Sequence, residues 1–380
     1  MTDHPFSCPT GSFDLCRRPL VQGLRAWDGA DEYLLELAAQ HTTQHTARSA
    51  LVINDNFGAL ACALHHLQPV SWSDSYTTHL ATRDNYARNG IYTNNGIETE
   101  FVALPSTASP NTSVDLVLWR VPKSLSLFEQ QIARLRPALH ETTVILVGGM
   151  DKHLPPDAKT LLARLGNVTT LPGKKKSHVF RVEFDPALPA PREPGVTTLP
   201  FPEWQLTLTG DAAVFAREKI DIGARFFIEQ FKLLPPAQRI ADLGCGSGIL
   251  SLVLASMRPK SEIFGFDESY QAIASAEQNW ARNRGETATS HFHVDDGLSH
   301  YSGAPFELIV CNPPFHQQHV IGDHIARQLF AQAKQHLRKG GELWVVGNRH
   351  LDYQTTLRRM FGQCRQINAN PKFVVLAATH

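Results

Sequence analysis

A run of four residues, Asn312 to Phe315, has the residue types and spacing needed to orient a planar amine for reaction. An amine on a base or an amide is a poor nucleophile, because its lone pair is delocalised into the π-system. Two acceptors on its hydrogens turn that lone pair out of conjugation, and the Asn312 side-chain oxygen and the Pro313 carbonyl are suited to this. The two prolines fix the backbone, so this geometry is set in advance.

Phe315 adds an aromatic face beside these acceptors. A base that has left its helix can stack there, which contributes about 1–3 kcal/mol. The run N-P-P-F after a strand is typical of enzymes that methylate an exocyclic amine with S-adenosylmethionine, whose methyl group is already activated as a sulfonium. The predicted catalytic residues are therefore Asn312, Pro313, Pro314 and Phe315. The alternative is a turn that only ends a strand, since neither proline can donate to a sheet.

A glycine-rich turn upstream has the composition of a site for this methyl donor. Gly244, Gly246 and Gly248 follow an apolar strand and allow the backbone to approach a ligand where a helix begins. Asp242 precedes them, and a carboxylate complements an ammonium and a sulfonium rather than phosphates. A dinucleotide site prefers G-x-G-x-x-G, with the last glycine one position later. The turn therefore predicts S-adenosylmethionine binding, and a tight structural turn is the alternative.

Two further acids follow later strands of the same half. Asp267 can accept hydrogen bonds from both ribose hydroxyls, although it could instead cap the next helix. Asp296 stands where it could bond the adenine amino group. Asp295 is the competing choice, and loop solvation is the bland alternative. These acids predict an adenosine ligand without naming it, because a nicotinamide enzyme would use the same groups.

Two histidines, His316 and His319, follow the N-P-P-F run as H-Q-Q-H. A metal pair would need a third ligand of suitable type and spacing, and the sequence offers none. We expect no bound metal. A substrate-facing, loop-ordering or structural role for these histidines stays open.

These residues need strands and helices to position them, and the chain supplies the same series twice. The C-terminal half has predicted strands at 239–243, 263–266, 290–294, 306–310 and 342–346. The N-terminal half has them at 50–53, 71–73, 115–119 and 143–147. Its second strand ends at an acid, Asp74, as the second strand of the C-terminal half ends at Asp267. The closest local match is N-Y-A-R-N at 85–89 with N-W-A-R-N at 279–283. This pattern predicts an α/β fold with two tandem Rossmann-like class I methyltransferase domains, each a doubly wound, mostly parallel sheet.

The N-terminal half lacks the chemical equipment of the C-terminal half. Its turn at 54–58 keeps one glycine, and Val121-Pro122-Lys123 replaces the N-P-P-F run. We therefore expect a degenerate domain that neither binds the cofactor nor catalyses. A basic spot at Lys174–Lys176, with His178 and Arg181 nearby, favours contact with RNA phosphates, and a solvated charged face is the alternative.

Proline density and composition bound the organisation of the chain. Six prolines between Pro186 and Pro202 predict a semi-rigid linker at 185–202, which separates domains at 1–184 and 203–380. No apolar run approaches the ~20 residues of a membrane span and no secretory signal is visible, so we expect a cytoplasmic protein. The six cysteines form no C-x-x-C pair, which favours reduced thiols, and the net charge of zero demands no nucleic-acid partner.

With these motifs in hand, the chain resembles the large-subunit ribosomal RNA methyltransferase G family. It is more distantly similar to the 16S rRNA guanine-N2 methyltransferase C family. N-P-P-F alone identifies the chemistry, whereas N-P-P-F-H-Q-Q-H together with N-R-H-L-D-Y and the duplicated architecture is far more specific. The matching segments span nearly the whole chain and include 25–27, 30–35, 121–125, 221–227, 312–319, 348–353 and 372–376.

The resemblance implies methylation of N2 of one guanine in 23S rRNA, guanine 1835 in that family, with S-adenosylmethionine as donor. It also implies that the first domain serves RNA recognition, and that the segment from Phe215 to Asp221 lines the cofactor pocket. We expect a monomer. The rival targets are 16S rRNA guanine N2, a protein glutamine and a DNA adenine. The rival classes are a nicotinamide oxidoreductase and an RNA-binding scaffold without catalysis.

Overall fold

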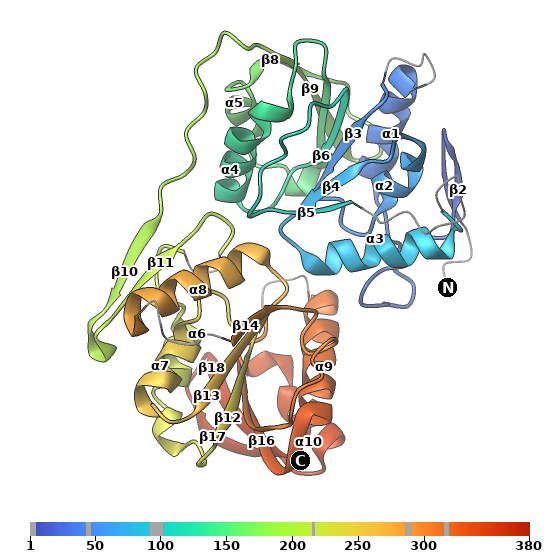
Figure 1. Cartoon of the computed structure of the whole chain (residues 1–380). Coiled ribbons are helices and arrows are strands. Elements are labelled where there is room, and N and C mark those ends of the chain that lie inside the picture. Colours follow the sequence, from blue (N-terminus) through green and yellow to red (C-terminus); the bar gives the residue numbers. More distant parts are fainter. Residues whose placement is uncertain (1–4, 43–46, 92–101, 215–216, 286–290, 315–318) are drawn as a thin grey trace. The chain divides into compact units, whose positions relative to one another are not determined.

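The chain divides into two compact units, Met1–Pro194 and Gly195–His380, in a computed structural model (Figure 1). The structure describes residues 5–42, 47–91, 102–214, 217–285, 291–314 and 319–380. We describe the N-terminal unit and the C-terminal unit each by itself.

The N-terminal unit contains a seven-stranded sheet in the order β5-β4-β3-β6-β7-β9-β8. Its strands are β3 (Ala50–Ile53), β4 (Val70–Ser73), β5 (Ala103–Pro105), β6 (Leu116–Arg120), β7 (Val144–Met150), β8 (Gly166–Thr170) and β9 (Ser177–Phe184). Its α-helices are α1 (Gly29–Thr42), α2 (Ala59–Ala63), α3 (Tyr76–Arg88), α4 (Leu125–Leu135) and α5 (Ala158–Leu162). A two-stranded ladder of β1 (Phe6–Cys8) and β2 (Gly11–Phe13) precedes them.

The C-terminal unit contains a seven-stranded sheet in the order β14-β13-β12-β15-β16-β18-β17. Its strands are β12 (Arg239–Leu243), β13 (Glu262–Asp267), β14 (His291–Val294), β15 (Phe306–Cys311), β16 (Leu337–Asn348), β17 (Arg365–Ala369) and β18 (Phe373–Thr379). Its α-helices are α6 (Ile222–Ile228), α7 (Ile249–Met257), α8 (Tyr270–Arg284), α9 (His319–His336) and α10 (Tyr353–Phe361). A hairpin of β10 (Thr197–Phe201) and β11 (Leu206–Gly210) comes first.

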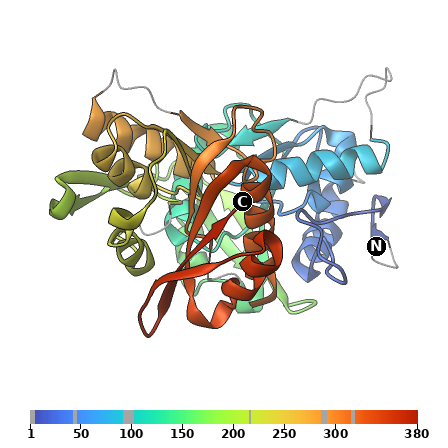
Figure 2. The same ribbon diagram turned by 90° about the horizontal axis from the view of Figure 1, so that it is seen from below.

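The two sheets have the same topology. In the C-terminal unit, strands β14 to β16 pair in parallel, and β18 and β17 close the sheet antiparallel; these closing strands are red in Figure 2. In the N-terminal unit, β9 and β8 close the sheet antiparallel in the same way. The predicted α/β class, with two tandem Rossmann-like domains, is confirmed.

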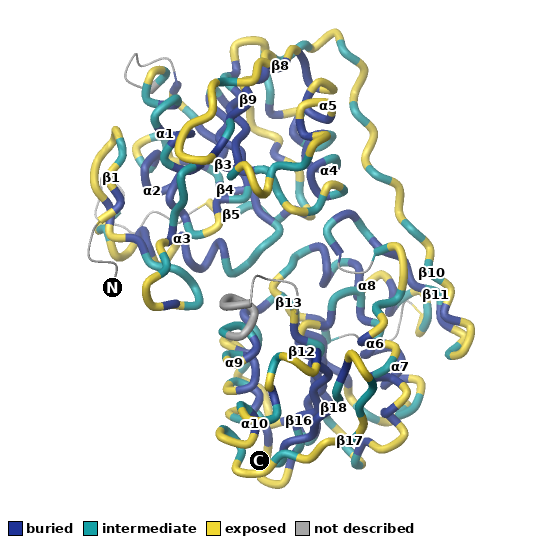
Figure 3. The backbone as a smooth tube through the Cα atoms, turned by 180° about the vertical axis from the view of Figure 1, so that it is seen from behind, coloured by how far each residue is buried: buried dark blue, intermediate teal, exposed yellow. Residues whose placement is uncertain are grey.

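Each sheet is buried on both faces, which explains why its strands read as nearly continuous apolar runs. In the C-terminal unit, side chains such as Ile240, Val310 and Trp344 pack in one core cluster with α6 and α7. The alternate residues, such as Leu243 and Val345, pack in a second cluster with α9 and α10. Figure 3 shows the strands dark blue between helices with yellow outer faces.

A buried asparagine on α8 fastens the upstream hairpin to the glycine turn. Asn279 accepts a hydrogen bond from Thr209 N at 2.7 Å and donates to Thr209 O and to Ser247 O, each at 3.0 Å. Because the side chain is fully buried and its amide is satisfied on both sides, it holds β11, α8 and the turn in one arrangement.

The N-terminal unit contains the same clamp with different partners. Asn85 on α3 accepts from Cys16 N at 2.8 Å and donates to Cys16 O and to Phe57 O. Phe57 therefore occupies the position of Ser247 in the other unit. The matching N-Y-A-R-N and N-W-A-R-N runs are thus the same structural device used twice.

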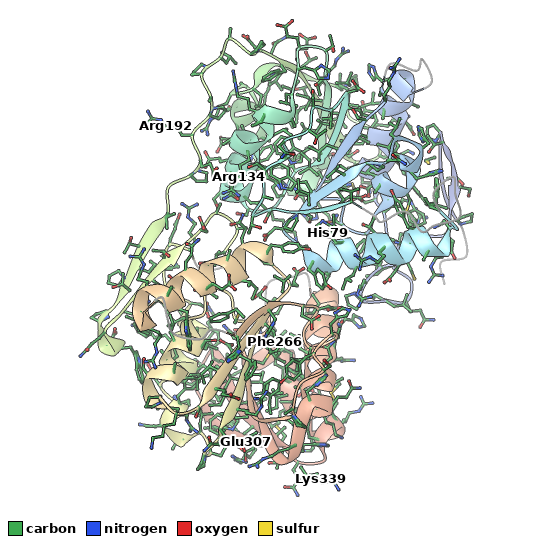
Figure 4. The ribbon with its side chains drawn as sticks, viewed as in Figure 1. His79, Arg134, Arg192, Phe266, Glu307 and Lys339 are labelled. Atoms are coloured by element: carbon green, nitrogen blue, oxygen red, sulfur yellow. The ribbon has the colours of Figure 1, made fainter. Side chains whose placement is uncertain are left out.

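The proline-rich segment is tied to both units in turn. Its first part lies on the N-terminal unit, where Arg134 donates to both carboxylate oxygens of Glu193 at 2.9 Å and Arg136 donates to Pro186 O; Figure 4 labels Arg134 and Arg192 here. Its second part forms β10, which pairs along its whole length with β11. The division between Pro194 and Gly195 falls inside the segment expected as a linker.

Several simple features complete the description. Among the described residues, no helix is both long enough and apolar enough to cross a bilayer. The same part of the chain holds no group of three His, Cys, Asp or Glu residues arranged for a metal ion. All six cysteines are free thiols.

Candidate active site

The predicted site residues of the C-terminal unit gather at one edge of its sheet. Asp242 and the glycines end β12, Asp267 ends β13, Asp296 follows β14, and Asn312 follows β15. Because these strands are parallel, their carboxyl ends meet, which is where open α/β sheets bind ligands. Four other residues named from the sequence are not covered. Phe215, Phe315 and His316 lie outside the described residues, and so does the side chain of His319.

The glycine turn leaves open space above its middle. Gly244, Gly246 and Gly248 have φ angles of +73°, +53° and +81°, a region that side chains rarely adopt. A Cβ on Gly246 would meet nothing within 4 Å, whereas one on Gly244 would lie 3.7 Å from Asn312 O. The turn thus brings a bare backbone beside the Asn312 loop, as a cradle for a ligand requires.

Asp242 is a buried carboxylate with one oxygen in use. Its Oδ2 accepts from Ser251 N at 3.1 Å and from Ser251 Oγ at 2.7 Å, which caps the first turn of α7. Its Oδ1 has no partner among the described residues. Burial raises the pKa of Asp242 to about 7, with a further contribution from Asp267. A cationic group of a ligand would relieve this arrangement, so the residue fits the ammonium end of S-adenosylmethionine.

Asp267 connects β13 to the glycine turn. One oxygen accepts from Gly246 N at 2.9 Å and the other from Ser269 N at 3.0 Å. Burial raises the pKa of this carboxyl. The helix-capping alternative for Asp267 does not apply, because Ser269 is the N-cap of α8 and accepts from Ala272 N.

The adjacent acids Asp295 and Asp296 differ in their commitments. The Asp295 carboxylate accepts from the backbone N–H of Asp296 and His300 and lies 2.7 Å from His300 Nδ1, so it organises its own loop. Asp296 accepts from Gln328 Nε2 of α9 at 2.8 Å. This difference favours Asp296 over Asp295 for the adenine contact, in keeping with the preference from sequence.

The Asn312 loop presents an acceptor at the end of β15. Asn312 Oδ1 is buried and has no partner among the described residues. Pro313 is buried and Pro314 is exposed. A buried oxygen without a donor costs about 1–3 kcal/mol, so the loop is prepared for a donor that a ligand brings.

Asp221 has a structural role that the sequence did not reveal. Its side chain is the N-cap of α6 and accepts from Ala224 N at 2.8 Å. The next residue but one, Gly223, packs against Phe373, since an added Cβ would lie 3.2 Å from that ring. Asp221 thus fixes the start of α6, and its contact with the cofactor stays a prediction.

Sequence reasoning missed three polar residues of this edge. Ser251 and Gln328 hold the carboxyls of Asp242 and Asp296. Asn348, which ends β16, is 8% exposed and has an unpartnered Oδ1 among the described residues. The available signal was the change from the apolar run 343–346 to an asparagine at the strand end.

Family models match both units of the chain. Residues 205–377 match the methyltransferase small domain, and residues 3–186 match the RLMG N-terminal domain. "Ribosomal RNA large subunit methyltransferase G" of Pseudomonas paraeruginosa is 42% identical over 377 residues, covering 98% of this chain and 99% of the relative. The protein of that name in Streptomyces griseus is 40% identical over 383 residues, covering 98% of each chain. This chain belongs to the ribosomal RNA large subunit methyltransferase G family.

A solved structure agrees with the fold of this chain. The 16S rRNA N2 G1207 methyltransferase RsmC of T. thermophilus, in complex with AdoMet and guanosine, superimposes with a TM-score of 0.75 at 21% identity. It covers 99% of this chain and 97% of its own. Membership in the family makes the protein an S-adenosylmethionine-dependent methyltransferase, which decides against the oxidoreductase and the non-catalytic scaffold.

In the N-terminal unit, an arginine stands at the position of Asn312, the residue predicted to orient the amine. Leu243 at the end of β12 pairs with Cys311, the residue before Asn312. Ile53 at the end of β3 pairs with Trp119, the residue before Arg120. The position is Asn312 in one unit and Arg120 in the other. Arg120 donates to Asp28 and to Asp31 at 2.6 Å, and it is 7% exposed. The position equivalent to Asn312 is thus occupied by a largely buried ion cluster.

The cofactor acids are replaced as well. Val52 stands at the position of Asp242, and the capping task passes to Asp55, which accepts from Ala61 N at 2.8 Å. Ala61, like Ser251, is the third residue of the helix that follows. Asp55 is fully buried, and burial raises its pKa to about 6. Asp55 therefore caps the helix that follows the turn, as Asp242 does in the C-terminal unit, but from a position three residues further along the chain.

The expected match between Asp74 and Asp267 is wrong by one residue. Ser75 N donates to Ser73 Oγ, as Ser269 N donates to Asp267. Ser73 therefore stands at the position of Asp267, the acid predicted to bind the ribose. A neutral hydroxyl in place of a carboxylate leaves one acceptor where two ribose hydroxyls need a pair.

The space above the degenerate turn is filled from within. Asn54, at φ +58°, stands at the position of Gly244 and donates to Arg120 O and to Gln131 Oε1, each at 2.9 Å. Gln131 Nε2 donates back to Asn54 Oδ1 at 2.9 Å. The structure thus supports the prediction that this unit has lost the cradle and explains what replaced it.

The basic spot of the N-terminal unit is largely neutralised. Lys174 pairs with Glu36, and Lys175 pairs with Glu32 and Glu36, two partly buried glutamates of α1. His178 pairs with Asp151. The structure therefore favours the solvated charged face, which was the alternative to phosphate contact.

Proposed function

We propose that this protein transfers the methyl group of S-adenosylmethionine to N2 of a specific guanine in 23S rRNA. The observation that carries the proposal is the buried, unpartnered Asn312 Oδ1 beside the open glycine turn. The names of the curated relatives, which cover almost the whole chain, support the large-subunit target. Bound cofactor supplies an activated methyl group, so the chain has to position the two partners and keep them together.

The C-terminal unit has a place for each part of the donor. Asp242 Oδ1 suits the ammonium group, and Gly246 leaves room for the ligand against bare backbone. Asp267 already accepts backbone hydrogen bonds on both oxygens, and each oxygen has further acceptor capacity for a ribose hydroxyl. Asp296 completes the series at the adenine. Phe215 and Asp221 extend this pocket on the resemblance alone.

The Asn312 loop performs the orientation of the amine. Its side-chain oxygen and the Pro313 carbonyl accept from the two hydrogens of the guanine amine, which directs the nitrogen lone pair toward the methyl carbon. The prolines hold these acceptors without a loss of entropy on binding. Pro314 and Phe315 complete the loop, with Phe315 as the stacking face for a base taken out of its helix.

RNA contact outside the catalytic edge has a candidate on the C-terminal unit. A cavity of about 420 Å³ lies where α9 and α10 flank the end of β16. Its lining is rich in basic side chains and comprises Arg327, His350, Leu351, Asp352, Thr355, Thr356 and Arg359. We assign it to the phosphate backbone near the target, because arginine pairs well with phosphate oxygens.

The two units have different roles in the proposed function. The N-terminal unit, 1–184, serves RNA recognition, and the catalytic unit, 203–380, works with it in a single chain as a monomer in the cytoplasm. The flipped guanine comes from RNA that is single-stranded or easily opened, since side chains cannot read the deep groove of an A-form helix.

The test is to identify the methylated nucleoside. The purified protein is incubated with isotope-labelled S-adenosylmethionine and, in separate reactions, with 23S rRNA, 16S rRNA, DNA or a protein mixture. Each substrate is then digested to its nucleosides or amino acids for mass spectrometry. We expect labelled N2-methylguanosine at one position. Labelled N6-methyladenosine in DNA, a labelled protein glutamine, or labelling of 16S rRNA instead would support one of the rival targets and overturn the proposal.

A further inference from the structure

Three neighbouring strands of the catalytic sheet end in polar side chains that form a diagonal row. Asp242 pairs in register with Val310, and Val310 pairs with Trp344. Asn312 lies two residues beyond Val310, and Asn348 lies four residues beyond Trp344. The row therefore steps outward along the carboxyl edge, from β12 to β15 to β16.

The three side chains belong to the same face of the sheet. Val310, Trp344 and Val346 all pack in the core cluster shared with α6 and α7. Side chains alternate along a strand, so Asn348, two residues beyond Val346, has the same direction. On the opposite face, Gly347 packs against Tyr353 of α10, which confirms the alternation up to the end of β16.

Each member of the row has a buried oxygen without a donor among the described residues. These atoms are Asp242 Oδ1, Asn312 Oδ1 and Asn348 Oδ1. Native structures satisfy the great majority of such groups, so each exception needs an explanation, and at a ligand-binding edge the ligand is one. The cofactor and the guanine amine account for the first two oxygens, and Asn348 remains without an assigned partner.

The fold itself does not need an amide at this position. Val345 pairs with Cys311, and Val147 of the N-terminal unit pairs with the equivalent residue, Trp119. Three positions further along each strand, Met150 is therefore the equivalent of Asn348. The N-terminal unit, whose cradle is filled, thus uses an apolar side chain there. Asn348 pairs in register with Phe373, an apolar neighbour that offers its amide no side-chain hydrogen bond. An amide placed there is explained by a ligand better than by packing.

We propose that Asn348 reads the O6 and N1–H groups of the target guanine. This inference rests on the proposed function. In the sheet order, β13 and β12 hold the donor and β15 holds the amine, so β16 lies on the side of the rest of the base. Guanine carries N1–H and O6 next to its C2 amine on one edge. The amide oxygen of Asn348 accepts from N1–H, and its Nδ2 donates to O6.

The test crosses a protein change with a base change. Asn348→Ala is compared with wild type on 23S rRNA in which the target guanine is either retained or replaced by 2-aminopurine, introduced by ligation of a synthetic fragment. 2-Aminopurine keeps the C2 amine and lacks both O6 and N1–H. For the wild type, kcat/KM should fall by about 10–100-fold on the analogue, since the site's amide is left unpaired.

For Asn348→Ala, kcat/KM on guanine should fall by a similar factor, while the value on 2-aminopurine changes little. The guanine preference should therefore collapse toward one. Asn348→Asp, which keeps the shape and loses the donor, should also reduce the guanine preference. It serves as the test variant if Asn348→Ala folds poorly. Asn368→Ala is the matched control: it removes a hydrogen bond to Gln230 at the far edge of the sheet and should leave the preference intact.

An unchanged guanine preference in both Asn348 variants would overturn the inference, as would a loss of S-adenosylmethionine affinity with the preference intact. These results leave the proposed function standing, because the wild type still forms N2-methylguanosine in the same assay. A wild type that forms none would overturn the proposed function and the inference with it.

Discussion

The carboxyl edges of the two sheets have the same architecture and opposite contents. In the C-terminal unit the glycine turn is bare and acceptors such as Asp242 Oδ1 and Asn312 Oδ1 lack partners among the described residues. At the matching edge of the N-terminal unit, Asn54 bonds to Gln131 and Arg120 bonds to Asp28 and Asp31. One edge is prepared for a ligand, and the other has supplied its own partners.

This difference shows which parts of a duplicated fold answer to chemistry and which to stability. The asparagine clamps of Asn85 and Asn279 are retained because each unit needs them to fasten its turn. Open space and unpaired oxygens carry a cost of about 1–3 kcal/mol for each buried group. Only a unit that binds a ligand has reason to keep them.

The largest expected effect lies at Asn312. Asn312→Ala should lower kcat for methyl transfer to rRNA by roughly 10²–10³-fold, by analogy with the removal of one precisely placed polar group from an active site. Cofactor affinity should stay near that of the wild type, because the glycine turn and Asp242 are untouched. Single-turnover kinetics and calorimetry measure the two quantities separately. Near-normal transfer would show that Asn312 does not orient the amine.

The equivalent position in the other unit should respond in the opposite way. Arg120→Met should cost roughly 3–5 kcal/mol of stability, because it leaves the buried Asp31 and the partly exposed Asp28 without their cation. Hydrogen exchange of the β3 and β6 amides measures this loss. Arg134→Met, which breaks a half-exposed pair with Glu193, is the matched control and should cost about 1 kcal/mol or less. Equal losses in the two variants would contradict a structural role for the buried cluster.

The shared clamps should respond alike in both units. Asn85→Ala leaves part-buried backbone groups of Cys16 unpaired and Asn279→Ala leaves buried backbone groups of Thr209 unpaired, and each change should cost about 1–3 kcal/mol. Thermal unfolding and hydrogen exchange, read for each unit, measure the two costs. A large loss in one unit and none in the other would show that the clamps are not equivalent.

The smallest expected effect concerns Asp242 and pH. Its folded pKa, about 7, lies above the unfolded value near 3.9, so the protonated carboxyl favours the folded state. That contribution is complete below the unfolded pKa and is lost as pH rises to about 7. Asp242→Asn should therefore gain ~1–3 kcal/mol over the ligand-free wild type at pH 8 and much less at pH 5.

Melting temperatures of the ligand-free proteins at the two pH values test this sign. The same variant should bind S-adenosylmethionine more weakly, since the ammonium loses its counter-charge. A variant that gains stability equally at both pH values, or that binds the donor as tightly as the wild type, would contradict the account.

Much of the fold was predictable, because its determinants are local. Apolar strands buried on both faces, glycines at strand ends and the repeated N-x-A-R-N run lie in plain sight in the sequence. The family resemblance supplied the target, which neither composition nor spacing could give. The glycines at 244, 246 and 248 also predicted a turn with positive φ angles, which the structure has.

The rest depended on partners that are distant in the sequence. The cap that Asp242 gives to Ser251 and the neutralisation of Lys174 by Glu36 arise only when separate elements pack together. The sequence matched Asp74 with Asp267, whereas the structure places its neighbour Ser73 at that position. Such a one-residue offset becomes visible only from the strand register. Asn348 opens the N-R-H-L-D-Y run that supports the family resemblance, but the sequence assigned it no role, and its burial at the sheet edge comes from the structure.

The most direct test of the central claim is the stoichiometry of cofactor binding to the whole chain. Isothermal calorimetry should find one S-adenosylmethionine site per chain. Gly246→Val, which places a strained side chain in the open space of the turn, should abolish it, and the matched variant Asn56→Val should leave it unchanged. Two sites per chain, or binding that survives Gly246→Val, would contradict the claim that only the C-terminal unit has kept the cradle.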